Sequence, residues 1–177
     1  MTKPIINVAA APTHSEANGE HFAYCMTELA AGAGAKSIGA NLTRVPPGKA
    51  AFPLHHHYGN EEHFFILSGS GVLRLGEATH AVKAHDYIVN LPGGPECAHQ
   101  LVNTGTQELV YLAISTLQTP EVVGYPDSAK TGVRMSADRS PDGRFLIADA
   151  ARKPRTSEEY WKDEDGESIA ALTSRDK

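Results

Sequence analysis

The sequence has few cysteines and no long apolar run. Two cysteines, Cys25 and Cys97, are too few for a disulfide framework, so reduced thiols in a cytoplasmic protein are expected. The first 20 residues lack the continuous apolar segment of a signal peptide, and no stretch reaches the length of a membrane span. We therefore expect a cytoplasmic protein with no membrane partner.

An excess of basic residues is also missing. Lysine and arginine together number 16 against 21 acidic residues, which gives a formal net charge of −5. A nucleic-acid partner calls for a surplus of positive charge, so nucleic acid is not expected as the main partner. The 177 residues, of which 41% are hydrophobic, suit one domain with a proper core.

The central part of the chain has the texture of an all-β protein. Between Ser37 and Ser115, short runs rich in β-branched, leucine and aromatic residues alternate with turn residues such as PPG, SGSG and PGGPE. Closely spaced strands of this kind favour a sandwich or barrel over alternating strands and helices. The runs are SIGANLTRV, HFFILSG, GVLRLG, THAVKA, DYIVNLP, HQLVN and ELVYLAIS.

The segments on either side of this barrel core (37–116) are less regular. Residues 1–36 predict an N-terminal arm of one or two irregular edge strands, because the glycines of AAGAGAK disfavour a long helix. Residues 117–151 predict a loop-rich segment packed on the barrel. Residues 152–177 carry 13 charged residues of mixed sign and predict a solvated tail with a short helix around SEEYWK. Tyr160 and Trp161 within it indicate docking on the barrel or on a second subunit.

Histidines gather in one place. Four of the nine lie between positions 55 and 63, three of them consecutive. In an extended segment, side chains alternate between faces, so His55 and His57 point to one face and His56 to the other. Gly59 and Asn60 then predict a turn, after which Glu61 or Glu62 returns beside the histidine pair.

A third imidazole comes from the segment after PGG. On the strand CAHQLVN, the residues Cys97, His99, Leu101 and Asn103 are expected to share one face. If this face looks inward, His99 joins the first pair. Three imidazole nitrogens and one carboxylate oxygen suit Mn, Fe, Co, Ni or Zn, whereas Ca or Mg would need more oxygen ligands. Four protein ligands leave two adjacent positions of an octahedral ion for a bidentate substrate, or for dioxygen with substrate.

The spacing of these residues resembles that of the cupin superfamily. The first cupin motif is Gly, five residues, His-x-His, three or four residues, Glu, six residues and Gly. Here six residues separate Gly48 from His55, four separate His57 from Glu62, and six separate Glu62 from Gly69. The second motif is Gly, five residues, Pro-x-Gly, two residues, His, three residues and Asn.

In the second motif Asp86 stands at the leading glycine, five residues precede Pro92, and Asn103 follows His99 at the family's spacing. Four residues, two more than in the family pattern, separate Gly94 from His99. The resemblance covers residues 37–115. It implies a jelly-roll β-barrel with one divalent transition metal ion (Fe, Mn, Ni or Zn) bound by His55, His57, Glu62 and His99, Glu62 being selected over Glu61 by the motif. It also implies a homodimer, for which the strand at Phe22 to Leu29 could add to a neighbour's sheet.

Other residues near these motifs have two interpretations. Tyr58, Phe65 and Tyr111 are candidate aromatic walls of a substrate pocket, but core packing explains them equally well. Cys97 could line the pocket or bind the metal, although burial as a small apolar side chain is the commoner fate of a free cysteine. Asn103 is a pocket candidate whose simplest role is a hydrogen bond to the backbone at a strand end. His56 is expected on the outer face, and His63 should point away from Glu62.

Cupin barrels carry out several reactions, so the resemblance predicts the residues of the site more closely than the reaction. We expect a metal-dependent enzyme that acts on a small polar molecule chelating the ion. An oxygenase of the dioxygenase type is marginally preferred, because no acid or base for an isomerase stands out in the sequence. A sugar phosphate isomerase is one alternative. A non-catalytic module that binds or senses a small ligand is another.

Overall fold

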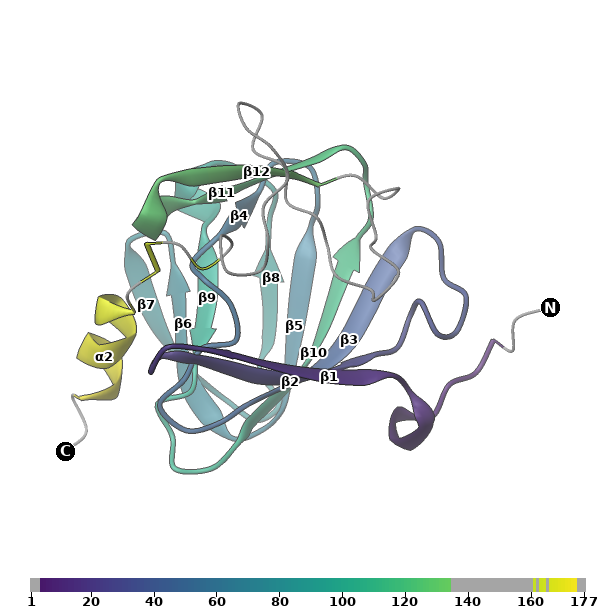
Figure 1. Cartoon of the computed structure of the whole chain (residues 1–177), viewed down its shortest axis with the longest axis horizontal. Coiled ribbons are helices and arrows are strands. Elements are labelled where there is room, and N and C mark those ends of the chain that lie inside the picture. Colours follow the sequence, from purple (N-terminus) through teal and green to yellow (C-terminus); the bar gives the residue numbers. More distant parts are fainter. Residues whose placement is uncertain (1–3, 135–160, 162, 165, 175–177) are drawn as a thin grey trace.

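The computed structural model describes residues 4–134, 161, 163–164 and 166–174, and it is an all-β fold (Figure 1). Its strands are β1 (Thr13–Asn18), β2 (Phe22–Glu28), β3 (Ile38–Val45), β4 (His56–His57), β5 (Glu62–Ser68), β6 (Ser70–Leu75), β7 (Ala78–Lys83), β8 (Tyr87–Asn90), β9 (His99–Val102), β10 (Leu109–Thr116), β11 (Glu121–Tyr125) and β12 (Lys130–Arg134). The helical elements are the 3-10 turns η1 (Val8–Ala10), η2 (Pro95–Cys97) and η3 (Pro126–Ser128), and the helix α2 (Glu167–Thr173). The predicted all-β jelly-roll class is confirmed.

The strands form three antiparallel sheets. The largest has the order β1-β2-β3-β10-β5-β8, and two smaller ones have the orders β7-β6-β9 and β12-β11-β4. In Figure 1, β11 and β12 cross the view at the top, over the ends of β5 and β10. The SGSG segment makes the tight connection between β5 and β6, and Gly69 within it has a φ of +83°. A side chain there would be strained, which is why glycine occupies the turn.

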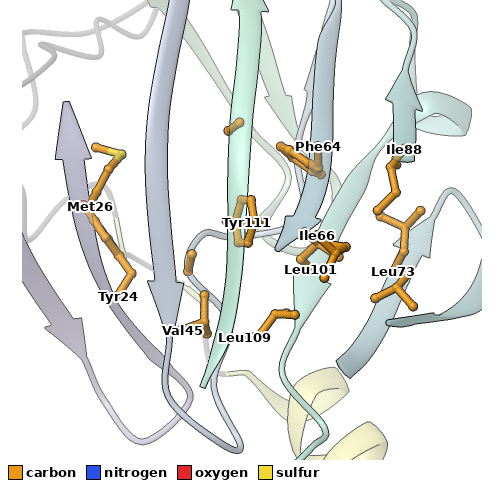
Figure 2. Close-up of a cluster of buried hydrophobic side chains, with 13 residues drawn as sticks. Tyr24, Met26, Val45, Phe64, Ile66, Leu73, Ile88, Leu101, Leu109 and Tyr111 are labelled. Carbon is orange, nitrogen blue, oxygen red and sulfur yellow. The ribbon is translucent and has the colours of Figure 1, made fainter. Parts of the chain in front are cut away.

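The core lies between the sheets, and strands such as β2, β5 and β10 contribute alternate residues to it (Figure 2). On β5, Phe64 and Ile66 are buried while Leu67 is exposed, and on β8, Ile88 is buried while Tyr87 is exposed. This period of two is the one that the sequence pattern predicts. Tyr111 of β10 fills the centre of the core and lies against Phe64 with 5.1 Å between ring centroids.

The N-terminal strands extend the large sheet instead of leaving its edge open. β2 pairs with β1 on one side and with β3 on the other. The strand that we expected to add to a neighbouring subunit is therefore already paired on both sides, and β1 and β8 are the edges of this sheet. The homodimer stays a prediction.

Two strands lie beyond Ser115, where the sequence pattern fades. The β11–β12 hairpin pairs with the short strand β4 and so belongs to the barrel, although a loop-rich segment was expected there. In the C-terminal tail, Trp161 packs on Phe22 with 4.7 Å between ring centroids. Ile169 of α2 is also buried in this contact region, so the tail docks on the barrel through these residues. Most of SEEYWK and the apolar stretch at 145–147 lie outside the described residues.

No helix in the described part of the chain has both the length and the apolar character needed to cross a membrane.

Candidate metal centre

The two histidines of the first motif are presented by a short extended segment. β4 is held on one side by β11, where Val123 pairs with His57. On the other side His55 forms an isolated antiparallel bridge with His99, through hydrogen bonds of 2.8 and 3.3 Å in the two directions. This bridge places the third imidazole beside the first. The two extra residues before His99 fall in the loop that contains η2, so the register of β9 is kept.

Four side chains converge at this point, namely those of His55, His57, Glu62 and His99. One atom from each lies within 4.8 Å of the others. The Oε2 atom of Glu62 is 3.0 Å from Nε2 of His99, 3.9 Å from Nε2 of His57 and 4.0 Å from Nε2 of His55. The structure therefore brings together the four residues that the sequence singled out, with Glu62 and not Glu61 at the centre.

On the far side, the second nitrogens of His55 and His99 are hydrogen-bonded, whereas that of His57 only lies near a carboxylate. Nδ1 of His55 donates to the carbonyl of Pro53 at 2.9 Å, and Nδ1 of His99 donates to the carbonyl of Cys97 at 3.2 Å. Nδ1 of His57 lies 3.6 Å from the Glu121 carboxylate. Because carbonyl oxygens can only accept, a neutral His55 carries its proton on Nδ1 and its lone pair on Nε2. Nε2 of His99 lies 3.0 Å from the Glu62 carboxylate and donates to it in the metal-free protein, and a metal ion would take the place of this proton.

This donor set fits a transition metal ion. Once the Nε2 proton of His99 is displaced, three Nε2 lone pairs and a carboxylate oxygen face one another, and such a set of acceptors suits a cation between them. An ion with bonds of about 2.1 Å has adjacent ligands about 3 Å apart and opposite ligands about 4.2 Å apart. The distances around Glu62 Oε2 fall within this range. Nitrogen-rich ligation with one carboxylate favours Fe, Mn, Co, Ni or Zn.

The electrostatics of the cluster favour the metal-binding forms of His55 and Glu62. Burial, with repulsion from His99 and His57, lowers the pKa of His55 well below its ordinary value of 6.5. Burial raises the pKa of the Glu62 carboxyl, but the hydrogen bond from His99 and the nearby imidazole charges outweigh it, and the pKa falls to about 2. At neutral pH His55 is therefore neutral and Glu62 is ionised, as a metal site requires.

These shifts predict how the metal-free protein responds to acid. Between pH 6.5 and the lower pKa of folded His55, the unfolded chain binds a proton that the folded chain does not. Glu62 acts in the same direction between pH 4.5 and about 2. The free energy of unfolding should therefore fall as the pH falls below 6.5. Thermal unfolding of chelator-treated protein from pH 8 to 5 checks this, and His55→Gln should flatten the slope. A midpoint that does not change with pH would contradict it.

Glu121 and Asn90 are two buried polar residues at the site that the sequence analysis missed. Glu121, at the start of β11, is 2% exposed and approaches His57 from behind. Asn90, the last residue of β8, pairs across the sheet with Glu62 and is fully buried, and both polar atoms of its side chain lack a partner among the described residues. The run EVVGY offered a weak strand signal for the first. Period-two alternation from Ile88 would have found the second.

The residues named as candidate pocket walls lie elsewhere. Phe65 alternates with Glu62 and Phe64 along β5 and is on the outer face, so Phe64, at 5.8 Å from the His99 ring, is the aromatic neighbour of the cluster. Tyr58 is 56% exposed and packs edge-on against His56. Tyr111 is fully buried in the core.

The two other pocket candidates, Cys97 and Asn103, lie just outside the two ends of β9. Cys97 ends η2 and is not on the strand with His99, so the expected shared face does not include it. It contributes its backbone carbonyl to His99. Asn103 is buried and donates to the carbonyls of Val45 and Gln107, which is the backbone role expected for it.

The remaining histidines of the cluster region point away from the four ligands. His56 faces the opposite side, as alternation predicts, but it is buried there, 2.8 Å from the carbonyl of Gly93, and not on the surface. His63 lies between Glu61 and the hydroxyl of Tyr87, at 2.6 Å from each.

Part of this chain is similar in sequence to a known protein family and to a curated protein. Residues 41–115 match the family model described as a cupin domain. Over 74 residues the chain is 34% identical to the oxalate-binding protein of Thermotoga maritima. This stretch is 42% of this chain and 58% of that protein, so the chain spans little more than half the length of the curated relative.

Two solved structures have the same fold. A proposed sugar phosphate isomerase from Acidithiobacillus ferrooxidans is 26% identical with a TM-score of 0.62, over 76% of this chain and 82% of that one. A protein from Silicibacter pomeroyi described as a sugar phosphate isomerase of the cupin superfamily is 20% identical with a TM-score of 0.69, over 88% of this chain and 98% of that one. The second likeness bears on the fold alone.

Proposed function

We propose that this chain, whose residues 41–115 match the cupin domain model, is a metal-dependent enzyme acting on a small, polar, metal-chelating molecule, preferably as an oxygenase. The observation that supports this is the convergence of three imidazole Nε2 atoms on one oxygen of Glu62, with each Nδ1 facing an oxygen on the far side. Such a set of acceptors binds a cation and leaves part of its coordination sphere free.

His55, His57, Glu62 and His99 would hold the ion. A divalent transition metal bound there supplies Lewis-acid polarisation of a chelating substrate and, when it is iron, activation of dioxygen. The side chains of His55 and Glu62 are 15% and 18% exposed, whereas that of His99 is 2% exposed. A small ligand therefore approaches from the side of His55 and Glu62, and His99 closes the buried side.

The surroundings of the cluster favour an oxygenase over an isomerase. An isomerase needs an acid or base that touches the substrate. Glu121 accepts hydrogen bonds from Gly59 and Asn60 behind His57, so it does not face the substrate side. Tyr111 is buried in the core, where burial and the nearby charge of Glu62 raise the pKa of its hydroxyl. Neither residue serves as a general base, and oxygen chemistry demands little beyond the metal and its free positions.

Two alternatives each have an observation in their favour. The likeness to the proposed sugar phosphate isomerase of Acidithiobacillus ferrooxidans favours an isomerase. The likeness to the oxalate-binding protein of Thermotoga maritima favours a non-catalytic module that binds a small dicarboxylate.

Oxygen consumption tests the preferred reaction. Protein loaded with Fe²⁺ is given catechols, thiols and keto acids in an oxygen electrode, and we expect uptake with at least one class. His80→Ala is the matched control, because it removes an exposed imidazole on β7. No uptake with any class, together with turnover of a sugar phosphate, would replace the oxygenase by the isomerase.

Substitution of Glu62 by glutamine separates an enzyme from a binding module. The amide keeps the shape of the side chain but removes the charge next to the three imidazoles. We expect an enzyme to lose turnover by about 100-fold or more even at saturating metal, since a metal ligand has been lost. In a binding module the variant would weaken metal affinity, and at saturating metal a bound oxalate would be retained. Calorimetry with oxalate and turnover assays on the same samples distinguish the two.

A further inference from the structure

Glu121 is a buried carboxylate that lies outside the matched cupin segment and yet reaches a residue of the metal centre. It is 2% exposed. One of its oxygens, Oε1, accepts a hydrogen bond from the backbone N–H of Gly59 at 3.3 Å and lies 3.6 Å from Nδ1 of His57. Its other oxygen accepts from the side-chain amide of Asn60. A buried carboxylate whose two oxygens both accept hydrogen bonds does not contribute to solubility, so it has another role in the structure.

The sheet register explains how Glu121 meets His57. Val123 is the direct partner of His57 across the pair of strands, and Glu121 precedes Val123 by two residues. Residues two apart on a strand share a face, and diagonal neighbours across an antiparallel pair are within reach of long side chains. The glutamate therefore extends along the strand towards the rear of the imidazole.

Neighbouring groups allow only one orientation of the donors around Glu121. The carbonyl oxygen of the Asn60 side chain accepts from the hydroxyl of Thr116 at 2.9 Å and from the backbone N–H of Gln118 at 2.6 Å. The amide nitrogen of Asn60 must then face Glu121. His57 Nδ1 is buried and has no hydrogen-bond partner among the described residues. The Glu121 carboxylate lies 3.6 Å from it, so a proton on Nδ1 would face this negative charge.

The β11–β12 hairpin that carries Glu121 is anchored at its far end. Asp127 in the turn binds Arg74 of β6 through contacts of 2.7 and 3.0 Å. Lys130 at the start of β12 lies 3.0 Å from Glu164 of the C-terminal segment, whose side chain is 3% exposed. These ion pairs tie the hairpin to the barrel and to the tail, which limits the movement of β11.

We propose that Glu121 is a positioning residue for the metal ligand His57. It keeps the proton on Nδ1, turns the lone pair of Nε2 towards the metal and strengthens the imidazole as a donor, as carboxylates behind metal-bound histidines do. The metal affinity of the cupin domain then depends on a hairpin beyond its matched boundary. This inference rests on metal binding as proposed above, but not on the reaction catalysed.

The test is metal affinity in variants, measured with Co²⁺ by visible absorption and by competition with a chromophoric chelator. Glu121→Gln is expected to weaken Co²⁺ binding by about 10- to 100-fold and to shift the absorption bands. Glu121→Asp, which keeps the charge, should lose less. Asp127→Ala is the matched control, because it loosens the hairpin without touching His57, and its Co²⁺ affinity should stay within about threefold of the natural protein.

A second measurement does not depend on how the variants fold. Nitrogen NMR of the histidines in the metal-free natural protein should find His57 protonated on Nδ1. Proton occupancy on Nε2 instead, or equal Co²⁺ affinity and spectra in Glu121→Gln, would overturn the inference. If Asp127→Ala lost as much Co²⁺ affinity as Glu121→Gln, the effect of Glu121 would be one on the stability of the hairpin, and the inference would also be overturned. A natural protein that binds no Co²⁺ would overturn the proposed function itself, which distinguishes the two failures.

Discussion

Replacing His99 with alanine is expected to lower the affinity of the protein for a divalent transition metal by at least about 100-fold, since loss of an outer-shell partner alone costs 10- to 100-fold. His99 has the shortest contact in the cluster, with Nε2 at 3.0 Å from Glu62 Oε2. It is also the most buried of the four side chains, so water reaches the vacated position only from the side of His55 and Glu62. Metal content after purification without nickel resin or chelator measures the effect.

The control for this prediction is His80→Ala. His80 is exposed on β7, and β6 separates this strand from β9, which carries His99. Removal of His80 therefore tests the loss of an imidazole that is not part of the four-residue cluster. We expect this variant to retain the metal of the natural protein. If His99→Ala bound metal as tightly as His80→Ala, the four-residue cluster would not be the metal site.

Gly124→Ala is expected to lower the free energy of unfolding by about 3 kcal/mol, because the added methyl group overpacks a buried part of the barrel. A Cβ at Gly124 would meet the ring of His56, with the nearest distance 2.1 Å to Nε2. This ring is 3% exposed and its Nδ1 is held by the carbonyl of Gly93, so it has no room to turn aside. Displacement of His56 would also move His57, its neighbour in the chain. Denaturant unfolding of the metal-free protein measures the first effect, and metal titration the second.

Gly59→Ala is the matched control for Gly124→Ala. A Cβ at Gly59 would make only an ordinary contact, at 3.4 Å from Glu121. We expect a change in unfolding free energy within about 0.5 kcal/mol. Equal losses in the two variants would mean that contact between Gly124 and His56 does not limit the packing of β4 on β11.

The local parts of the candidate site were predictable because they depend on short spacing. His55 and His57 are two residues apart, and an extended chain brings such residues to the same side whatever surrounds them. The same rule pointed His56 away. It could not predict that β11 would cover His56, because that contact joins residues about 70 positions apart.

For two of the candidate pocket residues, Phe65 and Cys97, the structure differs from the sequence interpretation. Phe65 was named in place of Phe64 although alternation from Glu62 selects Phe64. Cys97 was assigned to the strand of His99, but Pro95 begins a 3-10 turn that takes up the extra loop residues, and the strand starts only at His99. The sequence from Pro95 to His99 is compatible with a 3-10 turn and also with the start of a strand. Only the bridge between His55 and His99 decides between the two.

Period-two patterning and motif spacing within single segments were enough to predict the all-β class, the cupin resemblance and the four residues that converge. The tertiary structure alone decided how the imidazoles are oriented and what lies behind them. Glu121 reaches His57 only through pairing of β11 with β4, and Asn90 meets Glu62 only through pairing of β8 with β5. Register between distant strands arises from packing of the whole barrel, and no local pattern records it.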